Sequence, residues 1–254
     1  METAEYEIMF RTECRHWWYR ALHRVLFHHL EQFLPEWRNG VILDAGCGTG
    51  AVMEKLSQAR HPVGVDLSPE AIAFCRQRGL QNVFQADVSA MPFAGGSFDA
   101  VISSSVLYHQ WVPDVPAALR ETWRVLKPGG LLLVNVPACP ALHSAHDEAV
   151  LTARRFTTES LRRLLAQNGF EICRMTGWTT LLFPAAWLAR RARLSKKGRD
   201  FDDNQMPSSA ANWVFELIIR LEFFLFRLFP LPAVVALFCV SRKKEALPTA
   251  TAAT

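Results

Sequence analysis

The stretch "VILDAGCGTGAVMEKL" (residues 41–56) decides the fold of this 254-residue chain. Its first part, Val41–Ala45, is an apolar run typical of a buried strand, and it carries an acid, Asp44, just before three alternating glycines, Gly46, Gly48 and Gly50. Glycine lets a backbone turn sharply and approach a ligand closely. The stretch also fits the dinucleotide fingerprint G-x-G-x-x-G/A. The glycines alone therefore leave open a nicotinamide or flavin cofactor and another adenosine-containing ligand.

Strands and helices alternate along most of the remaining chain. Further strands are predicted at 62–65, 82–85, 98–103, 131–136, 170–174 and 234–240, with helices at 50–57, 67–79, 115–126 and 157–169. This alternation predicts an α/β fold with a doubly wound, Rossmann-like sheet of seven strands. We expect the sheet to be mostly parallel with an antiparallel last strand. Such sheets bind ligands at the carboxyl ends of their strands.

The same pattern divides the chain into four parts. Residues 1–40 are predicted as an N-terminal helical cap, and residues 41–180 as the ligand-binding core. Residues 181–232 form a helical insertion between the last two strands. Residues 233–254 contain the last strand and a disordered tail.

Composition excludes several classes of protein. Half of the residues are apolar, a fifth are charged, and the net charge of +4 is spread along the chain, so no nucleic-acid partner is expected. The six cysteines occur singly, which indicates reduced thiols in a cytoplasmic protein. No cluster has the spacing of metal ligands, and no window reaches the roughly 18 uncharged apolar residues of a membrane span.

Three acids narrow the choice of ligand. A carboxylate at Asp44 would repel a pyrophosphate lying over the glycine turn, but it suits a cationic ligand without phosphate, such as S-adenosylmethionine. Asp66 closes the second strand, where a carboxylate can accept hydrogen bonds from both ribose hydroxyls. Asp87 closes the third strand, where it can accept from an adenine amino group.

Four segments together resemble the class I S-adenosylmethionine-dependent methyltransferases of the methyltransferase type 11-like superfamily. They are "VILDAGCGTG" (41–50), "VGVDLSPEAIAFCRQRG" (63–79), "QADVSAMPFAGGSFDAVISSSVLYH" (85–109) and "VLKPGGLLLVNVP" (125–137). The resemblance implies S-adenosyl-L-methionine as cofactor and S-adenosyl-L-homocysteine as product. It also implies that the core is the cofactor-binding part of the chain.

The resemblance further implies a role for each residue at the cofactor. Asp44 orients the methionine ammonium, Asp66 holds the ribose hydroxyls, and Asp87 reads the adenine edge. The other implied contacts are the three glycines at the methionine and ribose, Leu67 on the adenine, the backbone of Val88 at its edge, and Ser103 or Ser104 under the methionine part.

Methyl transfer needs a general base only when the acceptor must lose a proton. His109 follows the fourth strand, and His146 with Asp147 follows the fifth, so these three are the candidate catalytic residues. Local hydrogen bonding is the alternative role for His109. Arg154 and Arg155 could bind an anionic substrate group or pair with nearby acids along a helix.

Two aromatic segments lie outside the core. The Trp17-Trp18-Tyr19 segment could cover the active site or pack its helix on the sheet. Residues 213–229 are apolar nearly all round, so this helix must be buried in protein, at a partner or in a lipid interface. Basic clusters at 190–199 and 242–244 suit an anionic membrane surface. A lid on the core and a peripheral membrane contact through 181–244 are compatible.

The sequence therefore predicts a cytoplasmic, membrane-associated methyltransferase that acts on a small, lipophilic acceptor. Methylation of RNA or protein is one alternative. A non-catalytic cofactor-binding or partner module is another.

Overall fold

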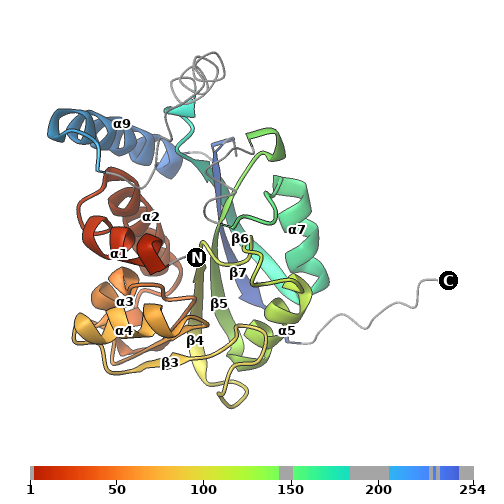
Figure 1. Cartoon of the computed structure of the whole chain (residues 1–254). Coiled ribbons are helices and arrows are strands. Elements are labelled where there is room, and N and C mark those ends of the chain that lie inside the picture. Colours follow the sequence, from red (N-terminus) through yellow and green to blue (C-terminus); the bar gives the residue numbers. More distant parts are fainter. Residues whose placement is uncertain (1–2, 143–150, 184–205, 229–230, 233–234, 246–254) are drawn as a thin grey trace.

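The computed structural model describes residues 3–142, 151–183, 206–228, 231–232 and 235–245, and centres on one seven-stranded sheet (Figure 1). The strand order is β3-β2-β1-β4-β5-β7-β6. Strand β7 pairs antiparallel with both β5 and β6, whereas the pairings among β1 to β5 are parallel. The predicted fold class is confirmed. The strands are β1 (Val41–Ala45), β2 (His61–Asp66), β3 (Val83–Gln85), β4 (Phe98–Ser104), β5 (Leu126–Pro137), β6 (Phe170–Trp178) and β7 (Ala236–Lys243).

Helices cover both faces of this sheet (Figure 1). On one face lie α2 (Trp17–Phe33), α3 (Ala51–Leu56) and α4 (Pro69–Gln77), and α5 (Val115–Val125) and α7 (Thr158–Gln167) lie on the other. The first helix, α1 (Thr3–Thr12), contacts α4, and the long helix α9 (Ser209–Leu228) contacts α2 and β6. Two short 3₁₀ turns, η1 (Trp37–Asn39) and η2 (Pro140–Leu142), complete the described elements.

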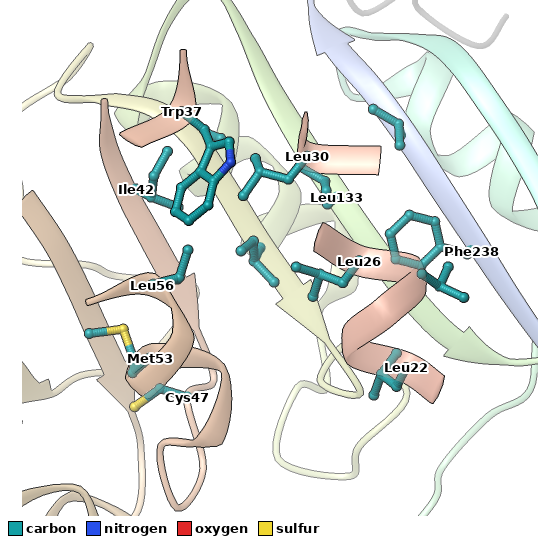
Figure 2. Close-up of a cluster of buried hydrophobic side chains, with 14 of the residues drawn as sticks. Leu22, Leu26, Leu30, Trp37, Ile42, Cys47, Met53, Leu56, Leu133 and Phe238 are labelled. Carbon is teal, nitrogen blue, oxygen red and sulfur yellow. The ribbon is translucent and has the colours of Figure 1, made fainter. Parts of the chain in front are cut away.

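Alternating strand residues divide the core into two layers. Ile42 faces the layer under α2 and α3, while its neighbour Leu43 faces the layer under α5 and α7. Figure 2 shows the first layer, where Leu26 and Leu30 of α2 pack near Leu133 and Phe238 of the sheet. Burying one such side chain contributes about 1.5–3 kcal/mol. The helix that precedes the first strand is therefore a structural part of the core.

Local signals place most of the helix ends. Ser68 caps α4 by accepting from the N–H of Ala71, and Gly79 follows that helix at φ +83°. Thr157 caps α7, but its capping-box partner is Ser160 and not the nearby Glu159. The N-terminal region is two helices, because α1 ends at Thr12 and His16 caps α2.

The Lys127-Pro128-Gly129-Gly130 segment precedes the strand predicted at 131–136, but it is itself part of a longer strand. It falls inside β5, which pairs with β4 through Leu126 before the turn and through Leu131 after it. The ladder skips the intervening residues, so the turn is a bulge within one long strand. A Cβ at Gly130 would lie 2.9 Å from the carbonyl oxygen of Lys127, which explains the glycine.

Candidate cofactor site

The glycine loop lies at the carboxyl end of β1, as the fold requires. Gly46, Gly48 and Gly50 all have positive φ, at +89°, +52° and +93°. A Cβ on Gly46 would lie 2.2 Å from a methyl carbon of Val106, so this position has no room for a side chain. The loop starts α3 directly, with Gly50 as its N-cap residue.

Asp66 is fixed beside this loop at the end of β2. Its Oδ2 accepts from the N–H of Gly48 at 2.9 Å, and its Oδ1 accepts from the N–H of Ser68 at 3.0 Å. Each carboxylate oxygen has a further lone pair for a hydroxyl donor. Burial raises the pKa of Asp66, while the two N–H donors oppose that rise.

Asp44 is the most buried acid of the site. It is 1% exposed, and its Oδ2 has no hydrogen-bond partner among the described residues. Burial, followed by the nearby Asp66 and Glu13, raises its pKa to about 8. A buried carboxyl without a partner is costly, so this atom is suited to a donor from a bound molecule.

The third strand end is more open. Asp87 is exposed, and its Oδ1 accepts from the N–H of Ser89 at 2.7 Å. Val88 is buried beside it, and the side chain of Leu67 is 44% exposed. An open acid, a packed neighbour and an exposed leucine are compatible with an aromatic base lying on this edge.

The carboxyl end of β4 supplies the last of the predicted cofactor residues. Ser103 is buried and Ser104 is partly buried, and the chain then turns at Ser105, which has φ +62°. Asn135 of β5 holds this turn by donating to the Ser105 hydroxyl at 3.2 Å. It also accepts from the indole N–H of Trp178 at 2.8 Å. Sequence analysis missed this support, because it joins three distant segments.

Of the three candidate catalytic residues, only His109 lies in the described part of the chain. His109 is partly buried, and burial lowers its pKa to about 4, so its ring is neutral at pH 7. Its Nδ1 has no hydrogen-bond partner in the described part of the chain. His146 and Asp147 lie outside the described residues. All three assignments stay predictions.

Arg154 donates to backbone carbonyls in the described part of the chain, and the two roles considered for it stay predictions. Its guanidinium donates to the carbonyl oxygens of Leu107 and Val112, and Arg155 donates to that of Ala138. Residues 151–156 are not helical, and Asp147 and Glu148 lie outside the described residues. Arg154 fastens this segment to the loop that carries His109, where Thr152 forms a bridge with His109.

An ion pair clasps the N-terminal region to the glycine loop. Arg78 of α4 pairs with Glu13 at 2.5 Å and donates to the carbonyl oxygen of Thr49 at 2.7 Å. The Thr49 hydroxyl also donates to Glu13. In addition, Tyr6 of α1 is buried, and burial and the nearby Asp66 carboxylate raise its pKa to about 12. Helix α1 therefore reaches the edge of the site.

Sequence analysis missed Tyr6, Glu13 and Arg78 because ordinary polar residues in helices carry no motif. The Trp17-Trp18-Tyr19 segment packs its helix against neighbouring elements. Trp18 packs against Trp178 of β6 with ring centres 5.5 Å apart, and Trp17 packs against Phe215 of α9 at 5.3 Å.

Comparison with known proteins agrees with this geometry. The family model described as a methyltransferase domain matches residues 43–134, which run from β1 into β5. Residues 43–134 therefore match a methyltransferase domain, which agrees with the resemblance of the four sequence segments to the class I enzymes. Its cofactor is S-adenosyl-L-methionine, as the sequence predicts.

Two similar proteins illustrate how far the likeness extends. Trans-aconitate 2-methyltransferase from Deinococcus radiodurans is 37% identical over 136 residues, which cover 51% of this chain and 50% of that protein. A probable S-adenosylmethionine-dependent methyltransferase from Mycobacterium tuberculosis is 30% identical over 169 residues, covering 65% and 60%. The chain thus spans about half or somewhat more of these relatives.

A solved structure shows the same fold over more of the chain. It is 1,6-didemethyltoxoflavin-N1-methyltransferase from Burkholderia thailandensis, with bound 1,6-didemethyltoxoflavin and S-adenosylhomocysteine. The TM-score is 0.57 and the identity 18%, with 96% of this chain and 87% of that one covered.

The residues present fit the methyltransferase cofactor. The unpaired Oδ2 of Asp44 would meet the ammonium, and the remaining lone pairs of Asp66 would meet the ribose hydroxyls.

Proposed function

We propose that this methyltransferase transfers a methyl group from S-adenosyl-L-methionine to a small, lipophilic molecule. The observation that carries the proposal is the pair of acids at the glycine loop: a buried, unpaired Asp44 beside a fixed Asp66. Both acids lie within the matched methyltransferase domain.

When bound, the cofactor supplies a methyl group that is already activated by a sulfonium. This chain then has to provide orientation, since an in-line displacement depends on geometry. Asp44 and Asp66 would fix the two polar ends of the cofactor, and the glycine loop would let the backbone approach it. Leu67 and Val88 would hold the adenine, while Ser103 and Ser104 would support the methionine part.

His109 is the proposed base for an acceptor that must lose a proton. Its neutral ring can accept a proton at pH 7, although a pKa of about 4 makes it a weak base. An acceptor of low pKa, such as a carboxylic acid, needs no base at all. His146 and Asp147 are the proposed alternative pair.

The small size and the lipophilic character of the acceptor are supported by separate observations, the first by a relative's name and the second by α9. Trans-aconitate 2-methyltransferase, a relative over half of the chain, acts by its name on a small acid. Helix α9 presents a long apolar face to solvent, which suits a protein that works where lipophilic molecules gather. We place the protein in the cytoplasm, in peripheral contact with anionic membrane through residues 181–244. No helix among the described residues has the length and apolarity to cross a membrane.

The site assignment is tested by titration calorimetry with S-adenosylmethionine. Asp66→Ala removes the ribose acceptor, and we expect binding at least about tenfold weaker, since each lost hydrogen bond to a charged group contributes about 1.5–3 kcal/mol. Glu171→Ala removes an exposed acid from β6 and serves as the control, with unchanged affinity. Wild-type affinity in Asp66→Ala would contradict the assignment.

The acceptor class is tested separately with an assay for S-adenosylhomocysteine release. A panel of lipophilic carboxylic acids, phenols and amines is compared with bulk tRNA and with a protein extract. Turnover with the small molecules supports the proposal. Turnover confined to tRNA or protein contradicts it while leaving the cofactor site intact.

A further inference from the structure

Helix α9 is apolar on two sides: Phe215, Ile218 and Ile219 pack against the core, and other large apolar side chains face solvent. Its Glu216 faces α2 and pairs with Arg20 at 2.8 Å and Arg24 at 3.5 Å. Its Glu222 is 2% exposed and accepts from the backbone N–H groups of Thr180 and Leu181. These carboxylates hold the helix against the protein, so its described acids are directed inward.

A second apolar side of the same helix faces solvent. Six large side chains are exposed by 44% to 66%, and we call them the α9 apolar face: Trp213, Val214, Leu217, Leu221, Phe224 and Leu228. Most are spaced three or four residues apart, so they form one stripe along the helix. A contiguous exposed stripe of this kind marks an interaction surface.

A groove between α2 and α3 opens beside this face. It has a volume of about 530 Å³, and its cationic lining residues are Arg20, Arg24, Arg38 and Lys55. A second hollow of about 340 Å³ shares Arg20 with it and is lined by Arg15, Met206 and Trp213. The cationic groove therefore continues to the first residue of the α9 apolar face.

Positive charge in this groove is not balanced by the described residues. Arg20, Arg24 and Arg220 all pair with the single carboxylate of Glu216. Two acids line the groove, and both are paired: Glu31 with Arg38 and Glu54 with Arg78. Lys55 lies in no ion pair in the described part of the chain. Burial and the neighbouring arginines lower the pKa of Lys55 and of Arg24, which shows that these cations are crowded.

Two donors in the groove also lack acceptors. The indole N–H of Trp37, a residue that is 1% exposed, and Nη1 of Arg24 have no hydrogen-bond partner among the described residues. Buried donors normally find acceptors, and crowded cations are stabilised by an anion. An anion bound in the groove would therefore give these two donors and Lys55 a partner.

We propose that the groove binds the phosphate of an anionic phospholipid while the α9 apolar face lies in the interface of the bilayer. This inference rests on the proposed peripheral membrane contact and names its headgroup site. Continuity of the two surfaces favours a lipid over a soluble anion, because one molecule would use both. A second copy of the chain is disfavoured as the occupant, since a two-fold symmetric contact would bring the cations of the two grooves close together, where they would repel each other.

The position of Trp213 is consistent with this orientation. It borders both the arginine-lined hollow and the apolar stripe, and tryptophan is enriched where a membrane meets water. The α9 helix would lie along the membrane plane, as interfacial helices do.

Co-sedimentation of the full chain with vesicles tests the proposal. The probes are phosphatidylcholine vesicles and vesicles in which a third of the lipid is phosphatidylglycerol. We expect binding to the anionic vesicles and weak binding to the neutral ones. Lys55→Gln should weaken anionic binding about fivefold, the effect of one cation near an anionic surface. Arg162→Gln, which removes an exposed cation from α7 on the other face of the sheet, is the matched control.

The outcomes separate the headgroup site from the membrane contact. If Lys55→Gln binds like Arg162→Gln while Leu221→Ser weakens binding, the headgroup site is wrong and the membrane contact stands. If wild type binds neither vesicle, both are wrong, whereas S-adenosylmethionine titration still tests the methyltransferase proposal independently. Unchanged S-adenosylmethionine affinity in Lys55→Gln shows that this variant is folded.

Two other occupants of these surfaces, the chain's own acids and a second copy of the chain, would each give a distinct experimental result. Asp202 and Asp203 precede Met206 in the sequence, and anionic binding that appears only in Asp202→Asn with Asp203→Asn assigns the groove to the chain's own acids. A dimer in light scattering that Leu221→Ser dissociates assigns the apolar face to a second copy. Either result overturns the proposal.

Discussion

The glycine loop and α9 differ in which kinds of side chain they bury and which they expose to solvent. At the loop, carboxyl groups are withdrawn from solvent: Asp44 is almost fully buried, and Glu13 is held inside by Arg78. On α9, large apolar side chains are left in solvent while Glu222 is buried. Burying carboxyl groups and exposing large apolar side chains both cost free energy in the unliganded protein. A molecule that binds at either region can therefore be stabilised by relieving that cost.

The two regions differ in what determines them. The loop depends on residues within a few positions of one another, because its turn, its glycines and its acid belong to one segment. The face that α9 presents depends on contacts with α2 and with residues 180–181, which are far away in the sequence. Four variants or conditions test this contrast, beginning with the largest expected effect.

Gly46→Ala should abolish measurable cofactor binding. The new Cβ would overlap Val106 at 2.2 Å, and φ +89° is unfavourable for alanine by about 1–2 kcal/mol. Gly79→Ala is the matched control, because Gly79 also has positive φ but its Cβ would meet nothing within 4 Å. Calorimetric titration of both variants separates backbone strain from steric overlap. Equal losses would mean that strain alone is responsible.

Arg78→Ala should destabilise the fold by about 3–5 kcal/mol, since it leaves the buried Glu13 carboxylate without its partner. Arg76→Ala, an exposed position on the same helix, should change the free energy of unfolding by less than about 0.5 kcal/mol. Urea unfolding measures both. Adding Glu13→Gln to Arg78→Ala should recover part of the loss, and failure to do so would argue against a charge-based clasp.

Glu222→Ala should destabilise by about 2 kcal/mol, because two backbone N–H groups lose their acceptor. Its neighbour Leu221, which is 56% exposed, should tolerate Leu221→Ala within about 0.5 kcal/mol. Urea unfolding again gives both values. A larger loss of stability in Leu221→Ala than in Glu222→Ala would show that the acid is dispensable and that the apolar face is covered in solution. The difference drawn between α9 and the glycine loop would then be wrong.

Cofactor affinity should rise with pH between pH 6 and 7.5. The pKa of Asp44 is about 8 without ligand, so it is mostly protonated in this range, and a cationic ligand favours the ionised form. Binding therefore releases a proton, and affinity should increase by up to about tenfold per pH unit. The range stays below the pKa of about 7.7–8.0 usual for an α-amino group, such as that of the ligand.

The matching variant is Asp44→Asn. It should bind more weakly and show a flatter pH profile by calorimetric titration, because the titrating group is gone. A flat profile in the wild type would mean that Asp44 is already ionised before the cofactor binds.

Much of the core could be predicted from local sequence. Strand β1 and the glycine turn depend on neighbours in the chain, and each lies where the sequence predicts it. Helices α4 and α7, capped by Ser68 and Thr157, lie within the predicted ranges 67–79 and 157–169. The bulge in β5 was missed, because whether a Pro-Gly-Gly segment ends a strand or interrupts it depends on the pairing with β4.

The sequence by itself determined the sheet and the glycine loop with the acids that follow the strands, since these follow from local backbone freedom and from hydrophobic periodicity. Tertiary structure alone decided that Asp44 loses its hydrogen-bond partner, that Arg78 reaches Glu13 and that α9 turns its apolar side outward. The physical reason is that burial and charge pairing depend on which distant segments come together. A local pattern can name a residue type, but only packing sets its environment.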